Sequence, residues 1–187
     1  MRIFTSIIFT LLFLSGSAQV TTNIYWTTDT ELKAKDVIYY SAKLPLVWTD
    51  FIGVPKPVGP TAALTASGFG YKASSKSGSD GTEINIGVYC YFSKPDSWVV
   101  KGHNNAYVLA HEQLHFDITY IIAKSFLERI KKEKITPQNI NTLVPKIYQE
   151  LSAQMTAMQD QYDASAKHGI DKEMQAFWNN KIAAMLK

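Results

Sequence analysis

The segment His111-Glu112-Gln113-Leu114-His115 holds two histidines separated by three residues, with a glutamate directly after the first. Residues four apart lie on one face of a helix, so both imidazoles can reach a single Zn²⁺ ion. A glutamate at this position can act as general base on a water that the zinc activates. The sequence therefore predicts a zinc centre with His111 and His115 as ligands and Glu112 as the catalytic base. The alternative is a pair of core histidines hydrogen-bonded to the backbone or to tyrosine.

A catalytic zinc site needs a third protein ligand and one open position. Four residues are candidates for that ligand: His168, Asp163, Glu150 and His103. His168 directly precedes Gly169 at the expected end of a long helix, and its imidazole makes it the first choice. Asp163 lies on the flank of the same helix's apolar stripe and is the alternative. Glu150 is on the opposite flank, where solvation is the usual state, and His103 is expected to cap or precede the HExxH helix.

Other polar and aromatic residues receive simpler interpretations. Tyr162 lies on the apolar stripe of the long helix and is a candidate donor to a developing oxyanion. Asp117 follows the second histidine by two residues, so it points elsewhere on the helix and is expected to be solvated or to cap. Trp48 and Trp98 are expected to bury apolar area over the core, and Asp50 to cap a turn.

The pattern of elements predicts an α+β fold. Short β-favouring pieces at 24–27 and 37–40 precede two predicted strands at 62–72 and 83–93, which the turn-forming residues 74–81 join into a β-hairpin. A helix is expected from Asn104 or Asn105 to about residue 133 and carries the HExxH motif. A second should begin at Asn141 or Thr142, because Pro145 follows closely, and end at Gly169. A last amphipathic helix is expected over 171–186.

The chain begins with a segment typical of export. Arg2 precedes an apolar run, and Ser15-Gly16-Ser17-Ala18 offers small residues for cleavage before Gln19. We therefore expect residues 1–18 to be a signal peptide and 19–187 a single domain, secreted or periplasmic, with no membrane span in the mature chain. The single cysteine, Cys90, falls in an alternating apolar run and is expected to be buried and inert.

Composition bears on the class of protein and on its partners. The 187 residues are 46% hydrophobic and 19% charged, which predicts a packed core. A formal charge of +3, carried mainly by scattered lysines, is too small for a phosphate-binding surface, so nucleic acid is not an expected partner.

Four blocks of the sequence resemble DUF922, a family of bacterial exported proteins described as zinc-dependent proteases of the zincin type. The blocks occur in order along the mature chain and read VWTDFIG at 47–53, SWV at 97–99, HEQLHFDI at 111–118, and YD at 162–163 with HG at 168–169. The resemblance implies a zincin-like α+β fold and metallopeptidase chemistry.

The expected function is thus hydrolysis of peptide bonds in a peptide or protein substrate by a zinc metallopeptidase. The hairpin offers an edge strand along which an extended substrate could pair. Two alternatives share the metal site. One is a non-catalytic envelope binding module with a structural or vestigial zinc, for which a closed four-ligand site would be typical. The other is a zinc amidase acting on the cell wall.

Overall fold

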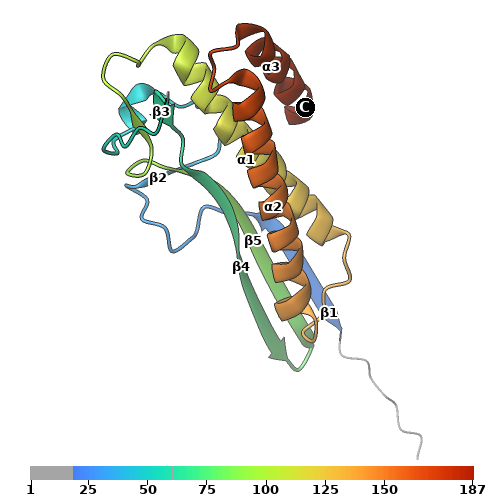
Figure 1. The fold of residues 1–187 in the computed structure, drawn as a ribbon. Coiled ribbons are helices and arrows are strands. Elements are labelled where there is room, and N and C mark those ends of the chain that lie inside the picture. The colour runs from blue at the N-terminus through green and yellow to red at the C-terminus, as the bar shows by residue number, and fades with distance from the viewer. Residues whose placement is uncertain (1–18, 60) are drawn as a thin grey trace, which may run out of the picture.

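A computed structural model describes residues 19–59 and 61–187. The predicted signal peptide, residues 1–18, lies outside the described residues. The fold is α+β, with a small mixed sheet and three helices (Figure 1). The strands are β1 (Val20–Trp26), β2 (Val37–Tyr39), β3 (Ala63–Leu64), β4 (Ser67–Gly78), β5 (Gly81–Ser93) and β6 (Trp98–Val99), with a short 3-10 helix η1 (Trp48–Asp50) between β2 and β3. The helices are α1 (Ala106–Lys131), α2 (Ile140–Ala166) and α3 (Lys172–Leu186).

The strand β5 is the centre of the main sheet. It pairs with β4 along its whole length in the predicted antiparallel hairpin. On its other side β1 pairs in parallel with the first half of β5, and β2 pairs antiparallel with its end. A separate two-stranded sheet joins β3 to β6.

The hairpin is longer than the sequence predicted. The turn was expected over 74–81, but β4 continues to Gly78 and only Ser79 and Asp80 connect the strands. Serine and lysine side chains fill this end of β4 and are exposed, so their composition resembles a loop although their backbone pairs with β5. Gly81 begins β5 with a φ of 130°, a backbone conformation that favours glycine.

The core lies between the sheet and the helices. Alternate residues of β5 from Ile84 to Phe92 are buried, as the apolar alternation predicted, and Cys90 is among them with 3% exposure. Burial raises the pKa of the Cys90 thiol, which agrees with the expected inert cysteine. In Figure 1, α1 and α2 lie side by side and antiparallel against this sheet, and α3 crosses the far end of the pair.

The helix boundaries agree closely with the sequence. Asn105 caps α1, because its side-chain oxygen accepts hydrogen bonds from the backbone N–H groups of Tyr107 and Val108. The helix α2 begins at Ile140, one residue before the predicted start, and α3 is capped by Asp171, whose side chain accepts from the N–H of Met174. No helix among the described residues has the length and apolarity needed to cross a membrane.

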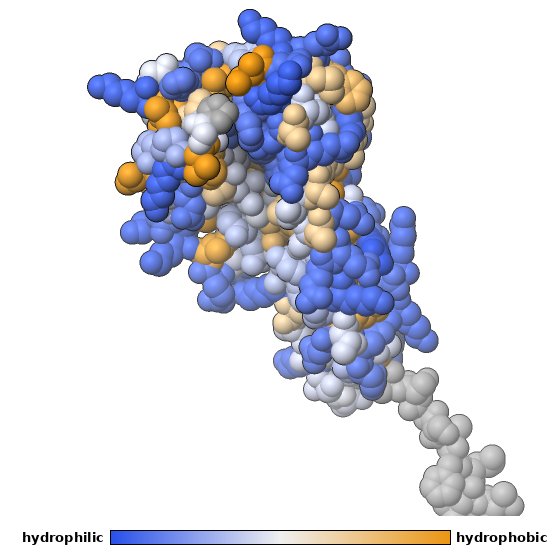
Figure 2. Space-filling model, in the orientation of Figure 1, coloured by the Kyte–Doolittle hydropathy of each residue, from blue (hydrophilic) through white to orange (hydrophobic). Residues whose placement is uncertain are grey.

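The surface has an apolar region at one end. Five aliphatic residues that are at least half exposed fall between β2 and β3: Leu44, Val47, Ile52, Val54 and Val58. In Figure 2 hydrophobic residues gather at the end of the molecule that carries η1 and β3, while hydrophilic residues cover most of the remaining face in view.

Candidate metal centre

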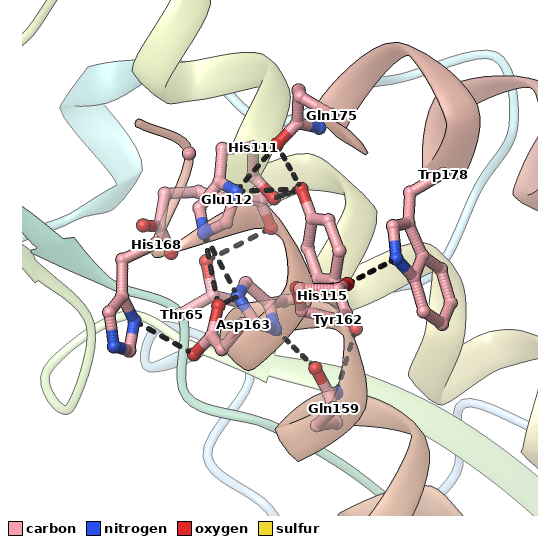
Figure 3. Close-up of polar contacts among 12 residues, drawn as sticks. Thr65, His111, Glu112, His115, Gln159, Tyr162, Asp163, His168, Gln175 and Trp178 are labelled. Carbon is pink, nitrogen blue, oxygen red and sulfur yellow. Dashed lines mark hydrogen bonds and ion pairs between the residues drawn. The ribbon is translucent and has the colours of Figure 1, made fainter. Parts of the chain in front are cut away.

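The site forms where the first half of α1 faces the last turns of α2. The cap at Asn105 places the start of α1 less than two turns before His111, and α2 runs antiparallel to it, so the end of α2 lies beside the HExxH segment. Figure 3 shows His111 and His115 turned toward Asp163 of α2. The ligand atoms of these three residues all lie within 4.8 Å of one another.

The three ligand atoms form a tight triangle. Oδ1 of Asp163 lies 3.2 Å from Nε2 of His111 and 2.9 Å from Nε2 of His115, and the two Nε2 atoms are 3.3 Å apart. Ligands at bond lengths of 2.0–2.1 Å in a tetrahedral site are about 3.3 Å from each other. His111, His115 and Asp163 therefore form a group that could hold a metal ion, and their spacing matches a small tetrahedral cation.

The charges in this triangle reinforce one another. Burial opposes ionisation of Asp163, but hydrogen bonds from His111 and His115 outweigh it and hold the pKa of this carboxyl well below its usual range. Burial likewise opposes protonation of His115, yet the hydrogen bond and charge of Asp163 raise the pKa of the imidazole. Asp163 is therefore a carboxylate at neutral pH, the form that a metal requires.

His168 lies beside this group, not in it. Its Nδ1 is 3.3 Å from Oδ2 of Asp163, the carboxylate oxygen turned away from the histidine pair, and its side chain is 44% exposed. The first choice for the third ligand was His168, whereas the structure brings Asp163 to the histidines. The reason is the end of α2: Lys167 and His168 both have left-handed backbones, so the chain leaves the helix before position 168 can face α1.

The other two candidates for the third ligand are also placed elsewhere. Glu150 forms an ion pair with Arg129, 2.7 Å long, on an exposed part of the helix pair. His103 is exposed and lies in the turn before α1, at the edge of the same cavity. Neither belongs to the triangle of ligand atoms.

Tyr162 is fully buried behind His111. Its hydroxyl lies 2.7 Å from Nδ1 of His111 and donates to Oε1 of Gln175 at 2.9 Å. This is the side of the imidazole opposite to Nε2, and burial raises the pKa of the phenol. The position does not support the oxyanion donor predicted for Tyr162. It makes Tyr162 part of the support of His111.

Glu112 carries an unusual carboxylate. The residue is 3% exposed, lines the cavity next to the triangle, and its Oε2 has no hydrogen-bond partner among the described residues. A buried carboxylate oxygen without a partner costs free energy, so such atoms normally serve a ligand, a water or a reaction. The backbone carbonyl of Glu112 is held separately by the hydroxyl of Thr65 at 3.1 Å.

Asp117 is buried, which corrects the expectation of a solvated or capping residue. Its Oδ1 accepts from the hydroxyl of Tyr40 at 3.0 Å and from Nε2 of Gln113 at 2.9 Å, and burial raises its pKa. Gln113 in turn accepts from the backbone N–H of Leu46. These bonds fasten the segment before η1 to the back of the HExxH helix.

Two glutamines that sequence reasoning missed contact the histidines. Oε1 of Gln175 lies 2.8 Å from Nδ1 of His111, and Oε1 of Gln159 is hydrogen-bonded to Nδ1 of His115. Gln175 is 2% exposed and shares the buried face of α3 with Trp178 and Ile182. The available sequence signal for Gln175 was a polar amide on the otherwise apolar stripe of the predicted last helix.

The triangle opens into a cavity of about 600 Å³. Its lining includes the five consecutive residues 61–65 and, from α2, Met155, Thr156, Gln159 and Asp163. Side chains alternate across an extended chain, so consecutive lining residues indicate that its backbone edge faces the cavity. The end of this segment and the chain just after it run along α1, because the Thr65 hydroxyl donates to the backbone carbonyl of Glu112 and the Ser67 hydroxyl is hydrogen-bonded to that of Thr119. The cavity is therefore a groove that contains the triangle of His111, His115 and Asp163.

Comparisons with protein-family models, with curated proteins and with solved structures find no match for this chain. The resemblance to DUF922 therefore stays a prediction from its four sequence blocks.

Proposed function

We propose that this protein is an exported zinc-dependent hydrolase of the zincin type that cleaves peptide bonds. Zinc would be held by His111, His115 and Asp163, a nitrogen and oxygen set that suits this ion. The predicted signal peptide and the sequence blocks shared with DUF922 agree with this proposal.

One observation carries the proposal: an unpartnered buried carboxylate stands beside a three-residue metal group in an open groove. A closed structural site would be expected to use four protein ligands. Here His168, the remaining candidate for a fourth ligand, lies with Nδ1 3.3 Å from the outer oxygen of Asp163 instead. A position therefore remains for water or substrate, which favours an enzyme over the binding module.

The side chains of the proposed site have separate roles. Zinc, when bound, supplies Lewis-acid activation of water and of the scissile carbonyl. Glu112 accepts the proton of the attacking water on its free Oε2 and passes it to the leaving amine nitrogen. His168 holds Oδ2 of Asp163, so that Oδ1 alone faces the histidines.

The groove suits an extended substrate. The strand β3 is paired with β6 on one side, and the segment that contains it presents a backbone edge to the cavity. A peptide lying along residues 61–65 could pair with this edge and pass over the metal group. A peptide or protein substrate is therefore favoured.

The decisive experiment is Glu112→Gln. The amide cannot accept the proton of water, so hydrolysis of a broad peptide pool should fall by about 10²- to 10⁴-fold, while the zinc content stays at one equivalent. Glu128→Gln is the matched control, because Glu128 is on the exposed face of the same helix and pairs with Lys131. It should leave both readouts unchanged.

Equal cleavage by wild type and Glu112→Gln would rule out the role of Glu112. Zinc binding with no chelator-sensitive cleavage of peptides would favour the binding module, and cleavage of a cell-wall fraction alone would favour the amidase.

A further inference from the structure

Each histidine of the HExxH motif has its second nitrogen against a glutamine from a different helix. Gln159 of α2 serves His115, and Gln175 of α3 serves His111 (Figure 3). Both contacts are to Oε1 of the amide and to Nδ1 of the ring. The two rings therefore have the same arrangement, with Nδ1 toward an amide oxygen and Nε2 toward Asp163.

The orientation of the Gln159 amide follows from its other partners. Its Nε2 lies 3.0 Å from the carbonyl oxygen of His115 and 3.1 Å from Oγ1 of Thr119. A carbonyl oxygen can only accept, so the amide nitrogen must face it and Oε1 must face the ring. Since Oε1 also only accepts, the hydrogen between it and the ring belongs to Nδ1 of His115.

Gln175 has the same arrangement, although its partners are side chains and not a backbone carbonyl. Its Nε2 donates to Oδ1 of Asn179 at 2.9 Å, and its Oε1 receives the hydroxyl hydrogen of Tyr162. Nδ1 of His111 lies 2.8 Å from that Oε1, a distance at which two acceptors without a hydrogen would repel each other. The hydrogen therefore resides on Nδ1 of His111.

We infer that Gln159 and Gln175 are positioning residues that hold His115 and His111 with Nδ1 protonated and Nε2 directed at Asp163, where a metal would take the place of the Nε2 hydrogen. An imidazole that binds a metal through Nε2 carries its hydrogen on Nδ1, and a buried N–H needs an acceptor. Because the two acceptors come from α2 and α3, the site is complete only when both helices are docked on α1. This inference rests on the proposed metal site.

Neutral amides at positions 159 and 175 keep the negative charge of the site lower than carboxylates would. Carboxylates at these two positions would add two negative charges beside a centre that already contains Asp163 and Glu112. The glutamines orient the rings without doing so, which preserves the Lewis acidity that the proposed hydrolysis requires.

The test compares four variants with the wild-type protein by zinc affinity, measured in competition with a chromophoric chelator. Gln159→Leu removes the acceptor of His115. Gln175→Leu removes the amide acceptor of His111 and leaves the Tyr162 hydroxyl, 2.7 Å from Nδ1, free to donate to that nitrogen instead. Each should weaken zinc binding by about 10- to 100-fold. Gln175→Glu keeps an acceptor for Nδ1 and should bind zinc at least as tightly as wild type. Gln159→Glu should stay weak, because one of its oxygens would face the carbonyl of His115. Gln161→Leu, on the exposed side of α2, is the matched control.

A second readout is the imidazole N–H signals in the nitrogen-15 spectrum of the zinc-loaded protein, which is simple because the chain has four histidines. The wild-type protein should show two Nδ1–H signals protected from exchange, and Gln159→Leu should lose that of His115. Melting of the metal-free variants verifies that they fold.

If both leucine variants bind zinc as tightly as wild type, the positioning role is wrong. The same holds if Gln175→Glu binds zinc as weakly as Gln175→Leu. Either result would leave the proposed metal site itself unaffected. A wild-type protein that binds no zinc would instead overturn the proposed function, together with this inference.

Discussion

The two halves of α1 have opposite surroundings. The half that includes Ile122, Phe126 and Ile130 is packed among apolar side chains of the sheet and of the first half of α2. The half that includes His111, Glu112 and Asp117 also has buried apolar residues, yet these three ionisable groups are buried among them. One helix thus serves as a hydrophobic core element at one end and as the base of a polar site at the other.

The antiparallel arrangement of α1 and α2 explains how both halves are stable. The start of α2 contributes Val144, Ile147 and Leu151 to the apolar half, and its end contributes Gln159 and Asp163 to the polar half. Buried polar groups are tolerated only when they are hydrogen-bonded, and almost every group in the polar half is. Among the described residues of this half, the buried side-chain atom without a partner is Oε2 of Glu112. The core against the sheet and the candidate metal site thus occupy different halves of the helix, and we expect that each can be removed without the other.

The largest expected effects come from one substitution in each half of α1, which should change zinc binding and folding stability separately. His115→Ala should abolish binding of one zinc equivalent and all chelator-sensitive hydrolysis, because two ligands cannot retain the ion. Phe126→Ala should instead lower the free energy of unfolding by about 3–5 kcal/mol, since a fully buried ring is lost, and leave the zinc stoichiometry of the folded protein unchanged. Elemental analysis and denaturant unfolding measure both. Loss of zinc in the Phe126 variant at full folding would show that the halves are coupled.

The next effect concerns the end of α2. Asp163→Asn should weaken zinc binding more than His168→Ala, because Asp163 faces both histidines and His168 touches only its outer oxygen. For His168→Ala a loss of about 10- to 100-fold is expected, typical of a group that orients a ligand. Chelator competition gives both constants. The reverse order would return His168 to the ligand position that the sequence first suggested.

Local patterns predicted the α+β class and the main helices and strands, and the polar half of the site less completely. The alternation along β5 and the cap at Asn105 are signals within a few residues, so the hairpin and α1 followed from them. The pair His111 and His115 needs only helical spacing. Asp163 and His168 are both near the end of α2, and the choice between them depends on left-handed backbone conformations that no side-chain pattern announces.

Contacts between residues far apart in the sequence could not be predicted, for a similar reason. Gln175 lies 64 positions from His111 and touches it only because α3 crosses the end of the helix pair. Asp117 was expected to be solvated or to cap from its place on the helix alone, whereas Tyr40, 77 positions away in the sequence, donates to it. Helical periodicity tells which face of a helix is apolar, but it does not tell which distant element supplies a polar partner.

The smallest expected effect tests how tightly the turn after α2 supports the polar half. Gly169 has a φ of 83°, and a Cβ there would lie 3.3 Å from Nδ1 and 3.4 Å from Cγ of His111. Gly169→Ala should therefore cost about 1–2 kcal/mol of stability through its backbone and also shift the His111 ring, weakening zinc binding several-fold. Gly102→Ala is the control, because Gly102 has a φ of 90° and no atom of the described residues lies within 4 Å of the added Cβ. It should show a similar loss in thermal unfolding with unchanged zinc affinity. If both variants bind zinc equally well, contact between the turn and His111 contributes nothing to the site, and the polar half depends on its hydrogen bonds alone.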